Sequence, residues 1–122
     1  MIRIVVVEDD EQVAALFAST LEDAGHEAVV CHNGGDVLAA IRARRPDVVF
    51  LDVRMPGMTG IEVLRSIRAA DSSLPVILVT GHATAGEIEQ ARRLGVTEVV
   101  EKPYILNEFA AALSRIAARR PD

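Results

Sequence analysis

The sequence predicts an α/β fold, a doubly wound, five-stranded parallel sheet with five helices on both faces. Apolar runs with strand character alternate with helical patterns five times along the 122 residues. The connections between them are short, and strict alternation with short connections favours parallel strands covered by helices. Half of the residues are apolar but only 3% are aromatic, so the core is expected to be aliphatic. We expect a single domain over residues 1–122.

The predicted strands are short runs rich in β-branched residues. The first, "IRIVVVE", is continuously apolar apart from Arg3 and the final Glu8, which is typical of a strand buried on both faces of a parallel sheet. The last, "EVVE", is the shortest. In chain order the predicted strands are residues 2–8, 27–32, 47–52, 75–80 and 98–101.

The predicted helices show apolar residues at helical spacing between these strands. The first ends at Gly25, the second before Pro46, and the fourth, residues 84–94, ends before Gly95 and has much polar surface. The apolar positions of the other four are Val13, Leu16, Phe17, Leu21 and Ala24, then Val37, Leu38 and Ile41, then Ile61, Leu64 and Ile67, and last Leu106, Phe109, Leu113 and Ile116.

Composition argues against several classes of protein. A formal net charge of -5 disfavours nucleic-acid binding by this domain. No apolar run reaches the length of a membrane span, and the amino terminus lacks the pattern of a signal peptide. Cys31 is the sole cysteine, so it is expected to be a small buried hydrophobe rather than part of a disulfide. These features indicate a cytoplasmic protein without membrane contact.

Polar residues stand at the carboxyl ends of four predicted strands, the edge at which such sheets bind ligands. Each has an ordinary explanation of its own: acids cap helices, an aspartate begins a turn, a threonine ends a strand and a lysine is solvated. No single explanation of this kind accounts for their gathering at one edge. They are Glu8, Asp9 and Asp10 after the first strand, Asp52 after the third, Thr80 after the fourth, and Lys102, the only lysine, after the fifth.

This set of residues fits phosphoryl transfer to an aspartate. Carboxylates at short range repel one another, and a hard cation such as Mg²⁺ relieves that repulsion. A carboxylate can also act as a nucleophile and form an aspartyl phosphate. Such chemistry requires neutralisation of charge on the phosphoryl oxygens. A compact ammonium group such as that of Lys102 and the hydroxyl of Thr80 could serve this need beside Asp52.

At this point the sequence resembles the receiver domains of two-component response regulators over essentially its whole length. The matching stretches, in order, are "IRIVVVEDDE", "PDVVFLDVRMPGMTG", "LPVILVTGH" and "EKPY". The resemblance implies the flavodoxin-like strand order 2-1-3-4-5. It also implies a phosphoprotein of bacterial signalling, in which Asp52 becomes a 4-aspartylphosphate. The phosphoryl group would come from a sensor histidine kinase or a phosphotransfer protein.

The resemblance also assigns the other residues. Asp9 is implied to bind Mg²⁺ directly, Glu8 through water, and the backbone carbonyl of Arg54 completes the protein ligands beside Asp52. Asp10 is instead expected to cap the first helix. Thr80 and Lys102 are implied to contact the phosphoryl oxygens.

Two further residues are candidates for tuning the lifetime of the phosphate, because they flank the path of the attacking water in the family. They are Arg54, two residues after Asp52, and His82, two residues after Thr80.

One position departs from the family pattern. Receiver domains often carry Tyr or Phe three residues before the lysine, where this sequence has Val99. Valine has one stiff torsion and cannot swing as an aromatic ring does. We therefore expect switching to act through the loop after Thr80 and the surface of the fourth helix. The resemblance places the contact with an output domain or partner on the fourth helix, fifth strand and fifth helix, and it allows a homodimer.

Three other functions fit parts of the sequence. A Mg²⁺-dependent phosphatase with an aspartate nucleophile needs a second aspartate two residues later, where Arg54 stands. A flavin-binding module needs phosphate-binding N–H groups after the first strand, where "EDDE" repels phosphate. A degenerate receiver that only mediates contacts would not need Asp52, Thr80 and Lys102 together. The sequence therefore favours a signalling domain whose only chemistry is its own phosphorylation and dephosphorylation.

Overall fold

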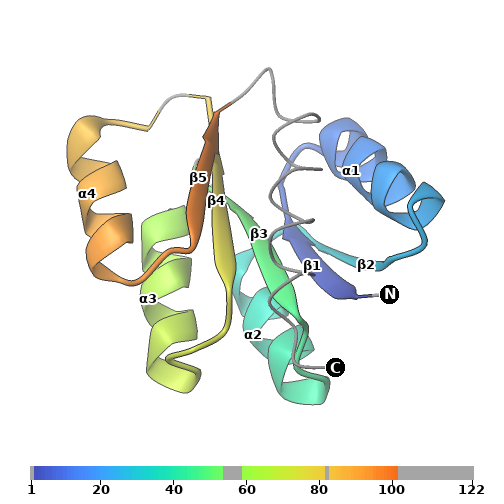
Figure 1. Cartoon of the computed structure of the whole chain (residues 1–122), viewed down its shortest axis with the longest axis horizontal. Coiled ribbons are helices and arrows are strands. Elements are labelled where there is room, and N and C mark those ends of the chain that lie inside the picture. Colours follow the sequence, from blue (N-terminus) through green and yellow to red (C-terminus); the bar gives the residue numbers. More distant parts are fainter. Residues whose placement is uncertain (1, 54–58, 82, 102–122) are drawn as a thin grey trace.

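The computed structural model describes residues 2–53, 59–81 and 83–101. Their five strands form one parallel sheet in the order β2-β1-β3-β4-β5, as predicted (Figure 1). Each strand lies within the range expected from the sequence. The bounds are β1 Arg3–Val7, β2 Glu27–Cys31, β3 Val48–Asp52, β4 Val76–Thr80 and β5 Glu98–Glu101.

Four helices connect the strands in the described ranges, and they cover both faces of the sheet. They are α1 Glu11–Asp23, α2 Gly34–Ala43, α3 Gly60–Ala70 and α4 Ala85–Arg93. Helix α1 lies on one face, whereas α2, α3 and α4 lie on the other (Figure 1). The fifth expected helix falls in residues 102–122, outside the described ranges.

The helices begin at side chains that accept hydrogen bonds from the backbone. Asp10 caps α1, as expected, by accepting from Gln12 N at 2.9 Å and Val13 N at 3.1 Å. Helices α3 and α4 begin with matching capping boxes, Thr59 with Glu62 and Thr84 with Glu87. These caps fix where each helix leaves the sheet edge.

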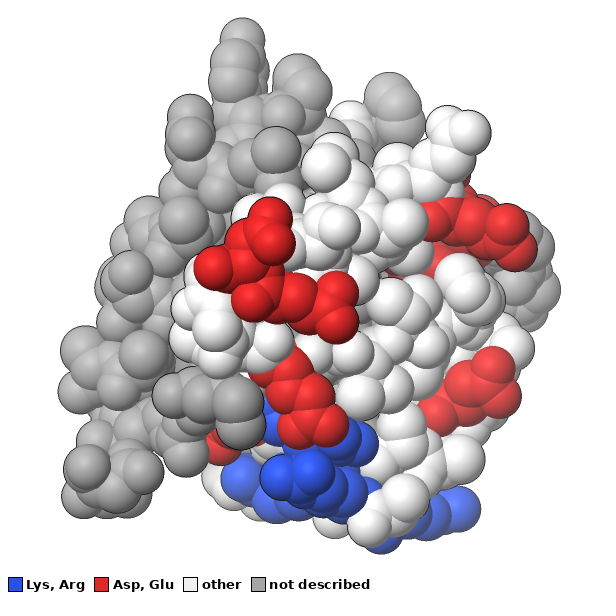
Figure 2. Space-filling model, turned by 90° about the vertical axis from the view of Figure 1, so that its right-hand side faces the viewer, with Lys and Arg blue, Asp and Glu red and all other residues white. Residues whose placement is uncertain are grey.

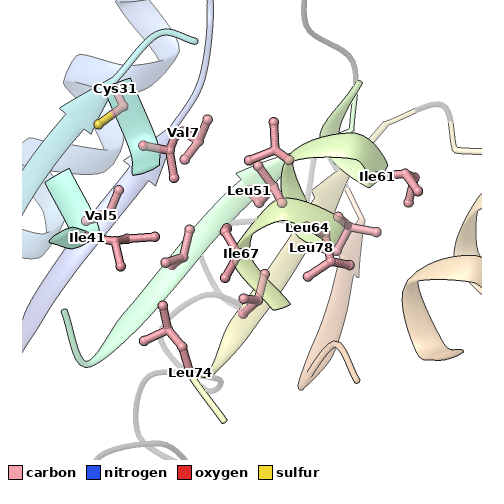
Figure 3. Close-up of a cluster of buried hydrophobic side chains, with 14 of the residues drawn as sticks. Val5, Val7, Cys31, Ile41, Leu51, Ile61, Leu64, Ile67, Leu74 and Leu78 are labelled. Atoms are coloured by element: carbon pink, nitrogen blue, oxygen red, sulfur yellow. The ribbon is translucent and has the colours of Figure 1, made fainter. Parts of the chain in front are cut away.

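The core is aliphatic and divided by the sheet into two clusters. The larger one lies between the sheet and α2, α3 and α4, and includes the side chains labelled in Figure 3. The smaller one lies beneath α1 and contains both described buried aromatic residues, Phe17 and Phe50. Cys31 is buried in the larger cluster, and burial raises the pKa of its thiol.

Two positions expected on the apolar face of the first helix are exposed, Leu16 and Ala24, and Ala24 is the C-cap of α1. Leu16 is 54% exposed, although its spacing placed it on the apolar face of the first helix. Helix α1 is buried instead through Ala14, Phe17 and Leu21. Leu16 is displaced from Phe17 by about 100° around the helix axis, which turns it toward solvent.

Charged residues meet at the amino-terminal ends of β1 and β2. Arg3 Nη1 lies 2.9 Å from Glu27 Oε1, and Arg44 Nη1 lies 3.6 Å from Glu27 Oε2. Seen from the side of α1 and β2, basic atoms gather along the lower edge and acidic atoms lie above them (Figure 2). No helix in the described part of the chain is long and apolar enough to cross a membrane.

Candidate functional site

Three carboxylates from two neighbouring strands meet at the carboxyl edge of the sheet. Glu8 and Asp9 follow β1, and Asp52 is the last residue of β3. One carboxylate oxygen from each lies within 4.8 Å of the others. Glu8 is 2% and Asp52 7% exposed, whereas Asp9 is open to solvent. We call Glu8, Asp9 and Asp52 the acidic cluster.

The register of the sheet brings these acids together from positions far apart in the sequence. Val7 of β1 pairs with Leu51 of β3, so the residues that follow them emerge side by side. Glu8 N also donates to Cys31 O at 3.0 Å, which extends the β1–β2 ladder beyond the end of β1. Glu8 is therefore held on the sheet itself rather than on a loop.

The donor set of the acidic cluster fits a hard divalent cation. Carboxylate oxygens are the ligands that Mg²⁺ prefers, and Mg²⁺ retains several waters when it binds proteins. The exposure of Asp9 leaves the cluster open to water on one side. Three carboxylates this close, two of them buried, also repel one another unless a cation or proton intervenes. The acidic cluster therefore provides a group of ligands that could hold a metal ion.

A pocket extends from the acidic cluster toward α1. Its lining combines two of the acids with aromatic and aliphatic side chains from α1 and three strands. The lining residues are Val6, Val7, Glu8, Phe17, Phe50, Asp52 and Val79. The side chain of Asp52 therefore belongs to the face of the sheet that α1 covers.

Thr80 stands one residue beyond the β4 partner of Asp52. Asp52 pairs with Val79, and Thr80 follows as the last residue of β4, 3% exposed. Its Oγ1 accepts a hydrogen bond of 2.7 Å from Ala83 N. Because Thr84 is the N-cap of α4, this bond ties the threonine hydroxyl to the start of that helix.

The other predicted site residues lie outside the described residues. They are Arg54, His82 and Lys102. Lys102 follows β5 directly, and the last residue of β5, Glu101, pairs with Thr80.

The structure adds two residues near the acidic cluster that the sequence did not assign to the site. His32 lies at the end of β2, and its Nδ1 is 2.9 Å from the carbonyl oxygen of Glu8. Gly60, the first residue of α3, donates from its N–H to Val53 O at 2.8 Å. The only signals in the sequence were a polar residue at a strand end and a glycine where a helix was expected to begin.

Comparisons with known proteins agree on the family. The family model of the response regulator receiver domain matches residues 4–114. The chain is 34% identical over 120 residues to the DNA-binding response regulator MtrA of Mycolicibacterium smegmatis, covering 98% of this chain and 52% of that protein. It is also 34% identical over 110 residues to the DNA-binding transcriptional regulator NtrC of Salmonella typhimurium, covering 90% and 24%. The chain thus spans about half or less of these relatives.

Solved structures show the same fold. The non-phosphorylated HemR receiver domain of Leptospira biflexa has a TM-score of 0.89 at 30% identity, with 98% of each chain covered. The receiver domain of NtrX from Brucella abortus has a TM-score of 0.87 at 31% identity, covering 96% of this chain and 99% of that one.

Proposed function

Since the chain belongs to the response regulator receiver domain family of two-component signalling, we propose that Asp52 is its phosphoacceptor. The observation that carries this proposal is the position of Asp52 at the end of a central strand, within 4.8 Å of two further acids. A carboxylate in such a place can be both a metal ligand and a nucleophile.

In the proposed step, a carboxylate oxygen of Asp52 attacks the phosphorus of a phosphohistidine. The new P–O bond forms as the P–N bond breaks, and the histidine nitrogen leaves with the electron pair and takes up a proton. Mg²⁺ held by Glu8, Asp9, Asp52 and the carbonyl of Arg54 would neutralise charge on the phosphoryl oxygens. We assign Lys102 and Thr80 to the remaining oxygens, and Arg54 and His82 to the tuning of phosphate lifetime.

The signal would leave the site through Thr80. A phosphoryl group adds roughly 1.5 to 2 negative charges, which draw the threonine hydroxyl toward Asp52. The hydroxyl is already bonded to Ala83 N, so its displacement changes the start of α4 directly. Val99 is half-buried against the larger core cluster, as is Ala83. Two observations support a switch that runs through the loop after Thr80 rather than through residue 99: Ala83 N is bonded directly to Thr80 Oγ1, and valine has one stiff torsion.

The proposed partners follow from the family. A sensor histidine kinase or phosphotransfer protein would supply the phosphoryl group in the cytoplasm. An output domain or partner, or a second copy of the chain, would contact the surface that includes α4 and β5. We propose no nucleic-acid contact by this domain, because its net charge is negative and the face shown in Figure 2 presents acids above a basic edge.

Intact-protein mass spectrometry tests the assignment of Asp52. The protein is incubated with a small-molecule phosphodonor, with and without Mg²⁺, beside the Asp52→Asn variant. We expect one added phosphoryl group that requires Mg²⁺ and is absent from the variant. An adduct that persists in Asp52→Asn would assign the chemistry to another residue.

The same assay separates the two alternative functions. If the wild type takes no phosphoryl group from the phosphodonor or from a phosphorylated histidine kinase, the domain is a degenerate receiver that only mediates contacts. Multiple turnover of simple phosphate esters would instead indicate the aspartate-nucleophile phosphatase.

A further inference from the structure

We propose that Gly60 is a positioning residue for Asp52, and that its missing side chain fixes where the Asp52 carboxylate lies. The proposal rests on the proposed function of Asp52, but the contacts that support it are separate from that assignment. A Cβ atom added to Gly60 would lie 2.2 Å from the carbonyl oxygen of Asp52. It would also lie 2.7 Å from Val53 Cα and 3.0 Å from the carbonyl carbon of Asp52.

These neighbours are backbone atoms, so no side-chain rotation can relieve the contact. Real Cβ atoms essentially never approach other heavy atoms within 3.0 Å, and a methyl group here would force a shift of the helix or of the strand. Gly60 is not among the described glycines with positive φ, which are Gly25 and Gly95. Its backbone is thus open to any residue, and only the close approach to Asp52 requires glycine.

Helix α3 cannot easily be the part that moves. Its residues Val63, Leu64 and Ile67 are fully buried in the larger core cluster. Its first turn is fixed by the capping box, and Gly60 N is bonded to Val53 O at 2.8 Å. A shift of the helix would disturb all of these contacts at once.

The backbone at the end of β3 is held to its neighbouring strand by a longer hydrogen bond than the one that holds the start of α3. Val53 N reaches Val79 O over a long 3.3 Å, just beyond the pairing of Asp52 with Val79. On the side away from α3, Asp52 borders the pocket that it shares with Phe17 and Phe50. A methyl group at residue 60 would therefore displace the backbone of Asp52 toward this pocket and change the position of its carboxylate relative to those of Glu8 and Asp9.

The test compares Gly60→Ala with Gly86→Ala. Gly86 also lies in the first turn of a helix that begins with a capping box, but its added Cβ meets only Thr84 Oγ1, at 3.9 Å. The dissociation constant for Mg²⁺ is measured by calorimetry, and the phosphorylation rate at saturating Mg²⁺ by mass spectrometry. Urea unfolding without Mg²⁺ measures the loss of stability separately.

We expect Gly60→Ala to weaken Mg²⁺ binding by about 10- to 100-fold, the range found when groups that orient metal ligands are changed. Phosphorylation at saturating Mg²⁺ is expected to slow as well. For Gly86→Ala both quantities are expected to stay within about twofold of wild type. Wild-type Mg²⁺ affinity in a folded Gly60→Ala variant, whatever its stability, would overturn the proposal, as would a wild type that binds no Mg²⁺.

A second pair of variants covers the case in which Gly60→Ala does not fold. Thr59→Ala removes the acceptor 3.2 Å from Glu62 N that fixes the first turn of α3, and Thr84→Ala removes the matching acceptor of α4. Mg²⁺ binding that is weaker in Thr59→Ala but not in Thr84→Ala supports positioning of Asp52 by the first turn of α3. Equal Mg²⁺ binding in the two variants contradicts it. Mg²⁺ binding could weaken in the variants as expected while neither the wild type nor any variant is phosphorylated. In that case the proposed function fails and the positioning role of Gly60 stands.

Discussion

Arg68, in the last turn of α3, donates a hydrogen bond from Nε to the carbonyl oxygen of Leu94, the C-cap of α4, at 2.6 Å. The same guanidinium group reaches three more backbone carbonyls. They belong to Gly95 at 2.9 Å, Leu74 at 2.7 Å and Asp71 at 3.3 Å. One side chain thus joins the end of α3, the start of β4 and the end of α4. Burial lowers the pKa of Arg68, partly offset by the charge of Asp71.

Arg68→Ala is expected to lower the free energy of unfolding by about 2–3 kcal/mol, because several carbonyls lose a charged donor together. Arg68→Lys is expected to recover only part of this loss, since an ammonium group lacks the planar fork that reaches several carbonyls. Urea unfolding measures both variants.

Arg65→Ala is the matched control for this prediction. Arg65 is an exposed arginine of the same helix, about one turn earlier, and its removal is expected to change stability by less than about 0.5 kcal/mol. Equal losses in the Arg65 and Arg68 variants would show that the contacts of Arg68 do not contribute in solution.

Neutralising one acid of the acidic cluster is expected to stabilise the metal-free protein. Asp52→Asn removes a like-charge repulsion and is expected to raise the free energy of unfolding by about 0.5–2 kcal/mol without divalent cation. Mg²⁺ at about 100 times its dissociation constant is expected to stabilise the wild type by about 2.7 kcal/mol and the variant by much less. Urea unfolding with and without Mg²⁺ measures both effects.

Glu22→Gln tests whether this stabilisation belongs to the cluster. Glu22 is an exposed acid of α1 outside the cluster, so its variant is expected to keep the full gain from Mg²⁺. A metal-free Asp52→Asn protein less stable than wild type would indicate that the carboxylate of Asp52 is already compensated.

The ion pair of Asp71 with Arg45 is expected to appear in the pH dependence of stability. Arg45 Nε lies 2.6 Å from Asp71 Oδ2, and this bond is the main reason that the pKa of Asp71 falls from 3.8 to about 2. Burial opposes the shift, and the N–H of Ser73 adds to it. Because the folded state favours the ionised form, the contribution is complete above pH 3.8 and is lost as the pH falls toward 2.

Carbon-detected NMR of the Asp71 carboxyl measures this pKa directly. Arg45→Ala is expected to return it toward the ordinary range, and Asp71→Asn is expected to flatten the fall of the urea midpoint over the same pH interval while retaining an acceptor for Ser73 and Leu74. An Asp71 that titrates near 3.8 in the wild type would mean that the ion pair does not persist in solution.

Phosphorylation is expected to move the start of α4 more than its end. Thr80 is bonded to Ala83, ahead of the helix, whereas Arg68 holds Leu94 and Gly95 at its end. Amide NMR shifts on phosphorylation are therefore expected to be larger for residues 83–88 than for residues 94–97. Thr80→Ser is expected to retain this pattern and Thr80→Ala to reduce it.

Methyl NMR of Val99 distinguishes this route from one through residue 99. We expect similar side-chain motion of Val99 with and without phosphate. Val99 is packed against the larger core cluster, and the proposed switch leaves that cluster intact. A large rearrangement centred on Val99 would contradict the proposed switch.

The fold could be predicted closely because its signals are local. Short continuous apolar runs such as "VVFLD" and "VILVT" are typical of buried parallel strands, and the polar residues at their ends, Asp52 and Thr80, mark the edge of the site. Leu16 was misplaced because its helical spacing suits either side of the buried stripe of α1. The choice depends on how the whole helix is seated on the sheet.

The contacts of Gly60 and Arg68 could not be predicted, because neither depends on a local pattern. Arg68 meets Leu94 across 26 residues, and only the packing of α3 beside α4 creates that approach. In the sequence it is one exposed-looking arginine among several. In the sequence Gly60 is one glycine at the start of a helix, and only the folded structure shows its close approach to the backbone of Asp52.

The acids of the cluster and the helix proposed to respond to phosphorylation come from different segments of the chain. All three acids of the acidic cluster stand at the carboxyl ends of β1 and β3, within the first 52 residues, whereas Thr80 and α4 follow later. The two parts meet along the pairing of β3 with β4. Thr80 belongs to both parts, because it ends the strand beside Asp52 and its hydroxyl is bonded to the residue that precedes the N-cap of α4. A substitution within α4 can therefore alter the response of that helix while leaving the three acids unchanged, whereas a substitution at Thr80 affects both.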